Sequence, residues 1–150
     1  MNRFEKFSAL IFEVTRQWHR ISTEEMSKYK LKGSYALYLS KISNYPDGIT
    51  AAVLSEECSR DKADVSRALA AMEKEGLVYR DNQGNRYRAK LRLTEKGTEV
   101  AEHVEKRSSL AVDGASLGIS DEERNTFYAV LEKITANLKE INKNAKDNSK

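Results

Sequence analysis

The sequence predicts a mainly α-helical fold with one small β-hairpin. A single proline, Pro46, interrupts 150 residues. Long stretches carry apolar residues at spacings of three and four, which is the period of one helix face. Only residues 77–93 change to an alternation of period two, which is typical of strands. An all-β fold is therefore excluded, and the length fits one domain, 1–150, with helical extensions.

Composition narrows the class of protein. Apolar residues make up 39% and charged residues 33%, which supports a core and excludes a wholly disordered chain. The apolar run at residues 9–12 is far shorter than the roughly 20 residues that span a bilayer, so we expect no membrane partner. No signal or transit peptide is recognised. With Cys58 as the single cysteine, an intramolecular disulfide is excluded, and the default expectation is the cytoplasm.

The first predicted helix lies within residues 1–32 and carries a narrow apolar stripe that needs a partner surface. A shorter helix is expected over residues 34–42, before the turn-like stretch 44–48. The stripe continues through Trp18 and Ile21, and its first members, named here the N-terminal stripe, are Phe4, Phe7, Ile11 and Val14.

Two helices separated by a short turn follow. Thr50 is a predicted N-cap for a helix through about residue 57, and Asp61 for a helix that stops at Gly76. The second of these helices has an apolar face opposite a small, cationic face. The apolar face holds Val65, Ala68, Leu69 and Met72, and the opposite face holds Ala63, Arg67, Ala70 and Lys74, flanked by Asp64 and Ser66.

A cationic hairpin comes next. Residues 77–80 are predicted as one strand, 81–85 as a turn and 86–93 as a second strand. Every second residue of the second strand is basic, and residues 80–92 hold five basic residues against one acidic, a net charge of +4. The whole chain has only +3, so its positive charge is concentrated here. The alternating basic residues are Arg86, Arg88, Lys90 and Arg92.

Two more helices are expected. Thr94 opens the first, which carries Val100, Ala101, Val104 and Leu110 and is broken by residues 114–118. The capping box at residues 120–123 starts the second, within residues 119–143, and residues 144–150 should fray. The second helix carries an apolar stripe, named here the C-terminal stripe: Phe127, Leu131, Ile134, Leu138 and Ile141.

A helix, a turn, a second helix with a cationic face and a cationic hairpin make a winged helix-turn-helix, expected over residues 33–97. Its second helix fits the major groove of double-stranded DNA. Arg67 can form a fork to guanine, and Ser66 can bond to a base or a phosphate. Three roles are open for Asp64. Its carboxylate can accept a hydrogen bond from cytosine, pair with Arg67, or interact favourably with the positive end of the helix dipole. The predicted recognition residues are Lys62, Ala63, Asp64, Ser66 and Arg67.

The two apolar stripes predict self-association, because two long helices flank a compact middle. A symmetric dimer would present two recognition helices to successive major grooves and would select a pseudo-palindromic site. The alternative function is a dimeric helical scaffold whose winged domain binds a protein partner. The alternating basic strand and Arg67 favour DNA, since a protein partner does not need a positive charge at every second residue.

Four motifs within residues 49–97 resemble the MarR family of winged-helix transcription regulators. They are ITAAVLSEE (49–57), DKADVSRAL (61–69), MEKEGLV (72–78) and LTEKG (93–97). The resemblance implies a homodimeric regulator, usually a repressor, often released from DNA by a small phenolic or other amphipathic ligand or by cysteine oxidation. It also implies that a wing arginine enters the minor groove, which leaves Arg86 and Arg88 as alternatives. The wing set is Asn85, Arg86, Tyr87, Arg88 and Lys90.

In this family the ligand pocket lies between the dimerisation helices and the winged domain. Trp18, His19, Tyr35 and Tyr38 fall in that zone, although ordinary core packing is the favoured interpretation for each. Cys58 falls where the first helix of the motif buries an aliphatic residue, so we expect an inert core thiol. No glycine-rich phosphate loop, metal-spaced cluster or nucleophile motif occurs, so no enzymatic activity, cofactor or metal is predicted.

Overall fold

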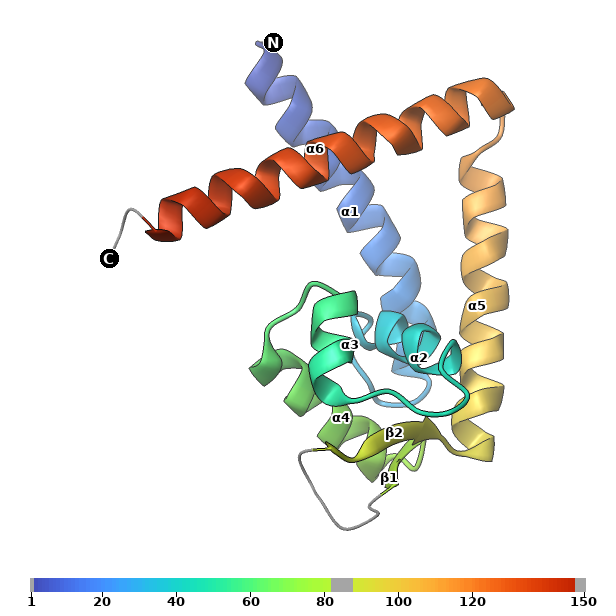
Figure 1. Cartoon of the computed structure of the whole chain (residues 1–150). Helices are drawn as coiled ribbons and strands as arrows, with labels where there is room; N and C mark the ends of the chain where they lie inside the picture. Colours follow the sequence, from blue (N-terminus) through green and yellow to red (C-terminus); the bar gives the residue numbers. More distant parts are fainter. Residues whose placement is uncertain (1, 82–87, 148–150) are drawn as a thin grey trace. The chain divides into compact units, whose positions relative to one another are not determined.

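The computed structural model describes residues 2–81 and 88–147 (Figure 1). The described residues are mainly helical with a two-stranded hairpin, which confirms the predicted fold class. No helix among them is both long and apolar enough to cross a membrane. The chain divides into two units, residues 1–110 and residues 111–150. The elements are α1 (Arg3–Ser27), α2 (Tyr35–Ser43), α3 (Ala51–Glu57), α4 (Lys62–Lys74), β1 (Val78–Asp81), β2 (Lys90–Leu93), α5 (Glu95–Ala115) and α6 (Asp121–Asp147).

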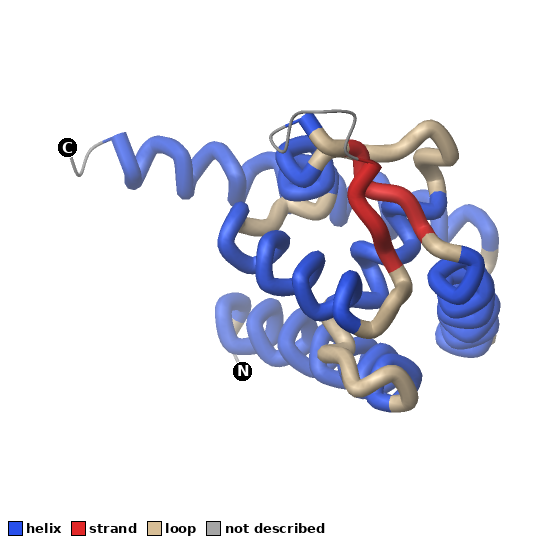
Figure 2. The backbone as a smooth tube through the Cα atoms, turned by 90° about the horizontal axis from the view of Figure 1, so that it is seen from below, coloured by secondary structure: helices blue, strands red, loops and turns tan. Residues whose placement is uncertain are grey.

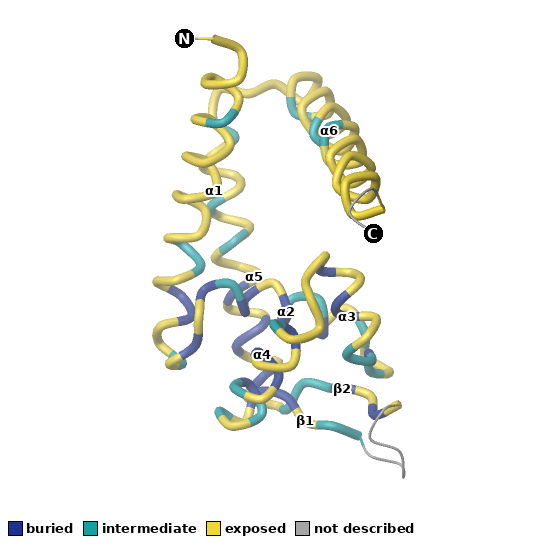
Figure 3. Tube along the Cα trace, turned by 90° about the vertical axis from the view of Figure 1, so that its left-hand side faces the viewer, coloured by how far each residue is buried: buried dark blue, intermediate teal, exposed yellow. Residues whose placement is uncertain are grey.

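Helix α1 begins with a capping box that the sequence interpretation missed. The Asn2 side chain accepts from the Glu5 backbone N–H at 2.9 Å, and the Glu5 carboxylate accepts from the Asn2 N–H at 2.9 Å. Only Glu25 and Met26 of this helix are buried, both near its C-terminal end. Figure 3 shows the same contrast, with the first part of α1 exposed and its end buried.

The end of α1 is joined to α5 through a buried carboxylate. Glu25 accepts from the Lys28 ammonium at 2.8 Å, and His103 Nε2 of α5 lies 2.6 Å from Glu25 Oε1. Lys28 holds the pKa of Glu25 below its usual value through this hydrogen bond, against the opposing effect of burial. The carboxylate is therefore paired on two sides, as a buried charge requires.

The helix–turn–helix follows the predicted caps. Thr50 Oγ1 accepts from the Val53 N–H at 3.3 Å, and Asp61 Oδ1 accepts from the Asp64 N–H at 2.6 Å. In the turn between α3 and α4, Ser59 has the left-handed φ of +50°. The buried Ser55 hydroxyl donates to the Arg60 carbonyl at 2.6 Å. This bond fixes the direction in which the chain enters α4.

The wing has two antiparallel strands, with Val78 opposite Leu93 and Asp81 opposite Lys90 (Figure 2). Ile49 adds a short bridge: it exchanges two backbone hydrogen bonds with Leu91, at 2.8 and 3.1 Å. The sequence did not predict this third segment, which anchors the start of α3 to the wing.

The prediction that the second strand begins at residue 86 is wrong for Arg88 and Ala89. Strand β2 begins at Lys90, because its pairing with β1 ends at Asp81, and Arg88 lies in a helical turn. Residues 82–87 lie outside the described part of the chain. The predicted alternation of faces still holds over residues 88–91, where Ala89 and Leu91 are buried and Arg88 and Lys90 are exposed.

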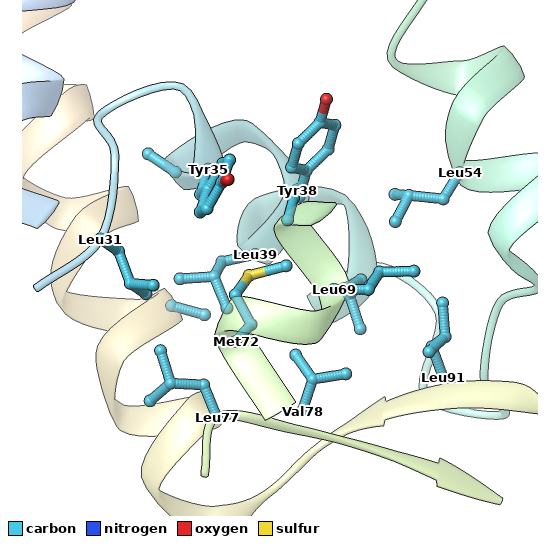
Figure 4. Packing of buried hydrophobic residues seen from close by; sticks show 14 of the residues in the cluster. Leu31, Tyr35, Tyr38, Leu39, Leu54, Leu69, Met72, Leu77, Val78 and Leu91 are labelled. Carbon is cyan, nitrogen blue, oxygen red and sulfur yellow. The ribbon is translucent and has the colours of Figure 1, made fainter. Parts of the chain in front are cut away.

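The core of residues 1–110 lies where α2, α3, α4 and the wing meet (Figure 4). Helix α4 contributes the whole predicted apolar face, and α5 contributes Val100, Ala101 and Val104, whereas Leu110 is exposed. The labelled core residues in Figure 4 are Leu31, Tyr35, Tyr38, Leu39, Leu54, Leu69, Met72, Leu77, Val78 and Leu91.

The junction between the wing and α5 is tightly packed. Thr94 Oγ1 donates to the Gly76 carbonyl at 2.6 Å and accepts from the Gly97 N–H at 2.9 Å. A Cβ atom at Gly97 would lie 1.8 Å from the Leu77 carbonyl oxygen. Position 97 therefore requires glycine for the close approach of two backbones.

In the unit of residues 111–150, Gly118 has a φ of +78° and precedes the predicted capping box. Ser120 and Glu123 cap each other at 2.8 and 3.2 Å, which starts α6. Helix α6 continues to Asp147, past residue 143, where the sequence prediction ended the helix. The positive charge of Lys146 in the last turn interacts favourably with the negative end of the helix dipole. Residues 148–150 lie outside the described part.

Candidate nucleic-acid interface

Helix α4 presents the predicted recognition residues on the face opposite the core. Its inward side chains are buried, so the orientation of the helix about its own axis is fixed by packing. Lys62, Ala63, Ser66 and Arg67 are exposed, with 64% of the Arg67 side chain accessible. Two of the four are basic, and all lie on the first turns of the helix, where recognition helices contact base edges.

Asp64, the fifth predicted residue, is half-buried and bound to the core. The Tyr38 hydroxyl of α2 donates to Asp64 Oδ2, while Arg67 Nη2 lies 3.7 Å from Asp64 Oδ1. The pairing with Arg67 considered from sequence is therefore present but longer than a hydrogen bond. The tyrosine partner was missed, and no sequence signal pointed to it because 26 residues separate the pair. Burial, followed by the bond to Asp64, raises the pKa of Tyr38.

The wing supplies fewer free cations than its sequence indicates. Arg88 and Lys90 are exposed, as predicted. Arg80 Nε lies 2.9 Å from a Glu73 carboxylate oxygen, and Arg92 Nε lies 3.4 Å from Asp81 Oδ2. Arg92 also donates to the Pro46 carbonyl at 2.8 Å. These two arginines hold the base of the wing to α4 and to the loop before α3. The predicted Asn85, Arg86 and Tyr87 lie outside the described residues.

The two apolar stripes remain largely uncovered within one chain. Every member of the N-terminal stripe, on α1, is exposed, and Phe4 is 76% accessible. On α6 three members of the C-terminal stripe are exposed, and Leu131 and Ile134 are half-buried. Sequence reasoning also missed several exposed apolar residues that widen these surfaces. They are Leu10 and Phe12 on α1, and Tyr128 and Val130 on α6.

A cavity of about 350 Å³ lies between α1, α2 and α5 within residues 1–110. Trp18 and His19 line it, as predicted. Tyr35 and Tyr38 are not among the lining residues: both belong to the buried core, which is the interpretation that the sequence favoured. The lining that the sequence did not indicate includes Gly33, Leu37, Ser40, Arg60 and Glu105.

Cys58 is buried at the end of α3. Desolvation by burial raises the pKa of its thiol, which opposes formation of the reactive thiolate. The core interpretation of this cysteine is therefore confirmed.

Comparison with known proteins agrees with this geometry. A model of the MarR family matches residues 29–86. An uncharacterized HTH-type transcriptional regulator of Bacillus subtilis, YybA, is 28% identical over 126 residues, which are 83% of each chain. Among solved structures, a SlyA-like regulator from Listeria monocytogenes is 27% identical, with a TM-score of 0.74 and 85% of both chains covered. The S. aureus MepR–DNA complex shares the fold at 19% identity, with a TM-score of 0.81. The match covers 91% of this chain and 99% of that chain.

A helix–turn–helix with an outward cationic helix and a two-stranded wing defines a winged helix-turn-helix protein. The transcription regulators that it resembles are matched over more than four fifths of their length. The similarity in sequence and in fold supports a winged-helix transcriptional regulator of the MarR type.

Proposed function

We propose that this regulator binds a pseudo-palindromic DNA operator as a homodimer and represses transcription there. The observation that carries the proposal is the exposed face of α4, where Lys62, Ala63, Ser66 and Arg67 stand opposite a buried apolar face. A helix held in this way can enter the major groove without unfolding any part of the core. Arg88 and Lys90 add positive charge that attracts phosphates.

The homodimer is supported by the exposed apolar stripes on α1 and α6. Contiguous exposed apolar side chains on a helix mark an interaction surface. A two-fold dimer buries the same stripe of both protomers and sets two copies of α4 a fixed distance apart, which selects a two-fold symmetric site.

The test is fluorescence anisotropy against duplexes enriched from a random pool, with unselected duplex as reference, across a salt series. We expect pseudo-palindromes with half-sites one helical turn apart, bound roughly a thousandfold more tightly than unselected DNA. A chain that enriches nothing and binds all duplexes weakly would contradict the proposal and favour a protein partner.

Single substitutions should distinguish base recognition from the general attraction between basic side chains and phosphates. Arg67→Ala should cost about 1 to 3 kcal/mol on the operator and relax one base position, whereas Arg88→Ala should weaken all duplexes alike and lower the salt slope by about one. Arg107→Ala, which removes an exposed arginine of α5, is the matched control and should change neither. An equal loss for Arg67→Ala on operator and unselected duplex would contradict its role in base recognition.

We further propose that a small amphipathic or phenolic ligand enters the cavity and releases the DNA. Release requires that the ligand bind better to a DNA-incompetent arrangement of the dimer. Trp18, the single tryptophan, lines the cavity, so its fluorescence reports occupancy directly. Titration with a set of phenols and aromatic acids should quench this fluorescence and lower operator affinity together, and Ser40→Leu, which fills part of the cavity, should abolish both effects.

A further inference from the structure

We propose that Tyr38 determines how sequence-specifically α4 binds DNA, because it binds one oxygen of the Asp64 carboxylate and keeps the other beyond hydrogen-bond distance of the Arg67 guanidinium, which stays available for a base. This inference rests on the proposed DNA binding by α4. It makes Tyr38 a positioning residue, buried and without access to DNA, that acts through its neighbour on the recognition helix.

The Tyr38 side chain is well placed to hold its hydroxyl in one position. The residue is 1% exposed and its ring packs against Tyr35, with ring centroids 6.0 Å apart. In Figure 4 the hydroxyl points away from the core cluster. Its acceptor, Asp64 Oδ2, lies on the first turn of α4. The bond therefore links the core to the recognition helix at the turn that carries the base-contacting side chains.

The same bond limits what Asp64 can do to Arg67. The two residues are three positions apart, a spacing at which helix side chains form ion pairs. With Oδ2 bound to Tyr38, the other oxygen stays 3.7 Å from Arg67 Nη2, beyond hydrogen-bond distance. Arg67 therefore keeps most of its donors available, and 64% of its side chain is accessible. A bidentate bond to guanine needs this freedom, because both donors of the fork must face the base.

Loss of the hydroxyl releases the carboxylate. In Tyr38→Phe the Asp64 side chain can rotate toward Arg67, form the full ion pair and occupy the guanidinium fork. It also presents a negative charge to the phosphates. The first effect reduces binding to the operator specifically, whereas the second weakens binding to any duplex.

The experiment measures the ratio of affinities for operator and unselected duplex by anisotropy at one salt concentration. Tyr38→Phe should reduce this ratio by about five- to tenfold, at the lower end of the loss expected for removing one base contact. Tyr35→Phe, which deletes a phenol hydroxyl from the ring packed against Tyr38, is the matched control and should leave the ratio unchanged. Thermal unfolding of both variants measures any general loss of stability.

A double variant tests whether Tyr38 acts through the Asp64 carboxylate. If Tyr38 acts through the Asp64 charge, Tyr38→Phe should have little effect in an Asp64→Asn background, where no carboxylate remains to occupy Arg67. A role in folding alone would instead lower binding to both duplexes in proportion and persist in that background. An unchanged ratio in Tyr38→Phe, or additive effects in the double variant, would overturn the inference. A wild-type protein that prefers no duplex would show the proposed function itself to fail.

Discussion

Helices α4 and α6 carry the same kind of apolar pattern and use it differently. In α4, Leu69 is 0% exposed and packs within a core shared by α2, α3 and the wing. In α6, Leu138 stands at an equivalent place in a stripe of threes and fours, yet it is 47% exposed, and none of the described residues of that helix is buried. A periodic stripe therefore predicts an apolar helix face, but it does not predict whether that face is buried within its own chain.

Helix α1 contains both situations in one element. Phe4 and the rest of the N-terminal stripe are exposed, while Met26 near the other end lies in the core. The buried core within residues 1–110 is formed by side chains of that unit alone. The stripes need a second surface, and a second copy of the chain is the partner that the proposed function supplies.

The largest effect should come from a charge placed in the C-terminal stripe. In the proposed dimer Leu138→Asp would bury two carboxylates in a symmetric interface, at a cost on the order of 3 kcal/mol or more, and the variant should sediment as a monomer in sedimentation velocity. Lys139→Asp, at the neighbouring exposed position, should remain dimeric. If both variants sediment alike, α6 is not part of the interface.

The next prediction concerns the stability of the core within residues 1–110. Leu69→Ala should lower the free energy of unfolding by about 2 to 5 kcal/mol in urea denaturation, because it opens a cavity in the core. Leu37→Ala removes the same atoms from an exposed position of α2 and should cost less than about 1 kcal/mol. Similar losses in the two variants would contradict the assignment of the core.

A smaller effect on stability should distinguish two glycines of α5. Gly97→Ala should destabilise by about 1 to 3 kcal/mol, since the new Cβ meets the Leu77 carbonyl oxygen. Gly114→Ala meets no atom within 4 Å and should stabilise by up to about 1 kcal/mol through helix propensity. The melting temperatures of the two variants should therefore shift in opposite directions.

The smallest effect concerns pH. The pKa of Glu25 is lowered in the folded chain, so its contribution to stability is present above the unfolded value near 4.5 and is lost as pH falls through the folded pKa. Glu25→Gln should flatten the acid limb of the melting temperature against pH. Lys28→Met, which removes the main cause of the shift, should flatten it in part. An acid limb unchanged in both variants would contradict the role of this carboxylate.

Features made by neighbours in the chain were predictable from sequence. The caps at Thr50, Asp61 and Ser120 and the exposed face of α4 depend on spacings of three and four residues, which the sequence displays directly. The bond from Tyr38 to Asp64 and the bridge from Ile49 to Leu91 join distant segments, so no local pattern announced them.

The start of β2 and the remaining residues of the cavity lining were not predictable from the sequence, for related reasons. The basic alternation from Arg86 onward has a strand period, but pairing with β1 decides where β2 begins, and that place is Lys90. The residue types in the pocket zone indicate aromatic side chains with polar groups but not the direction in which each one points. Which of them face the cavity depends on the rotation of α2, which places Leu37 and Ser40 there and turns Tyr35 and Tyr38 into the core.

The arginines at the base of the wing affect how DNA affinity should depend on salt. Each phosphate contact releases condensed counterions and contributes about −0.9 to the slope of log K against log salt. Arg80 and Arg92 already neutralise Glu73 and Asp81 within the fold. They count toward the charge of the sequence but displace no ions from DNA. Among the described wing residues, only Arg88 and Lys90 should therefore contribute to the slope.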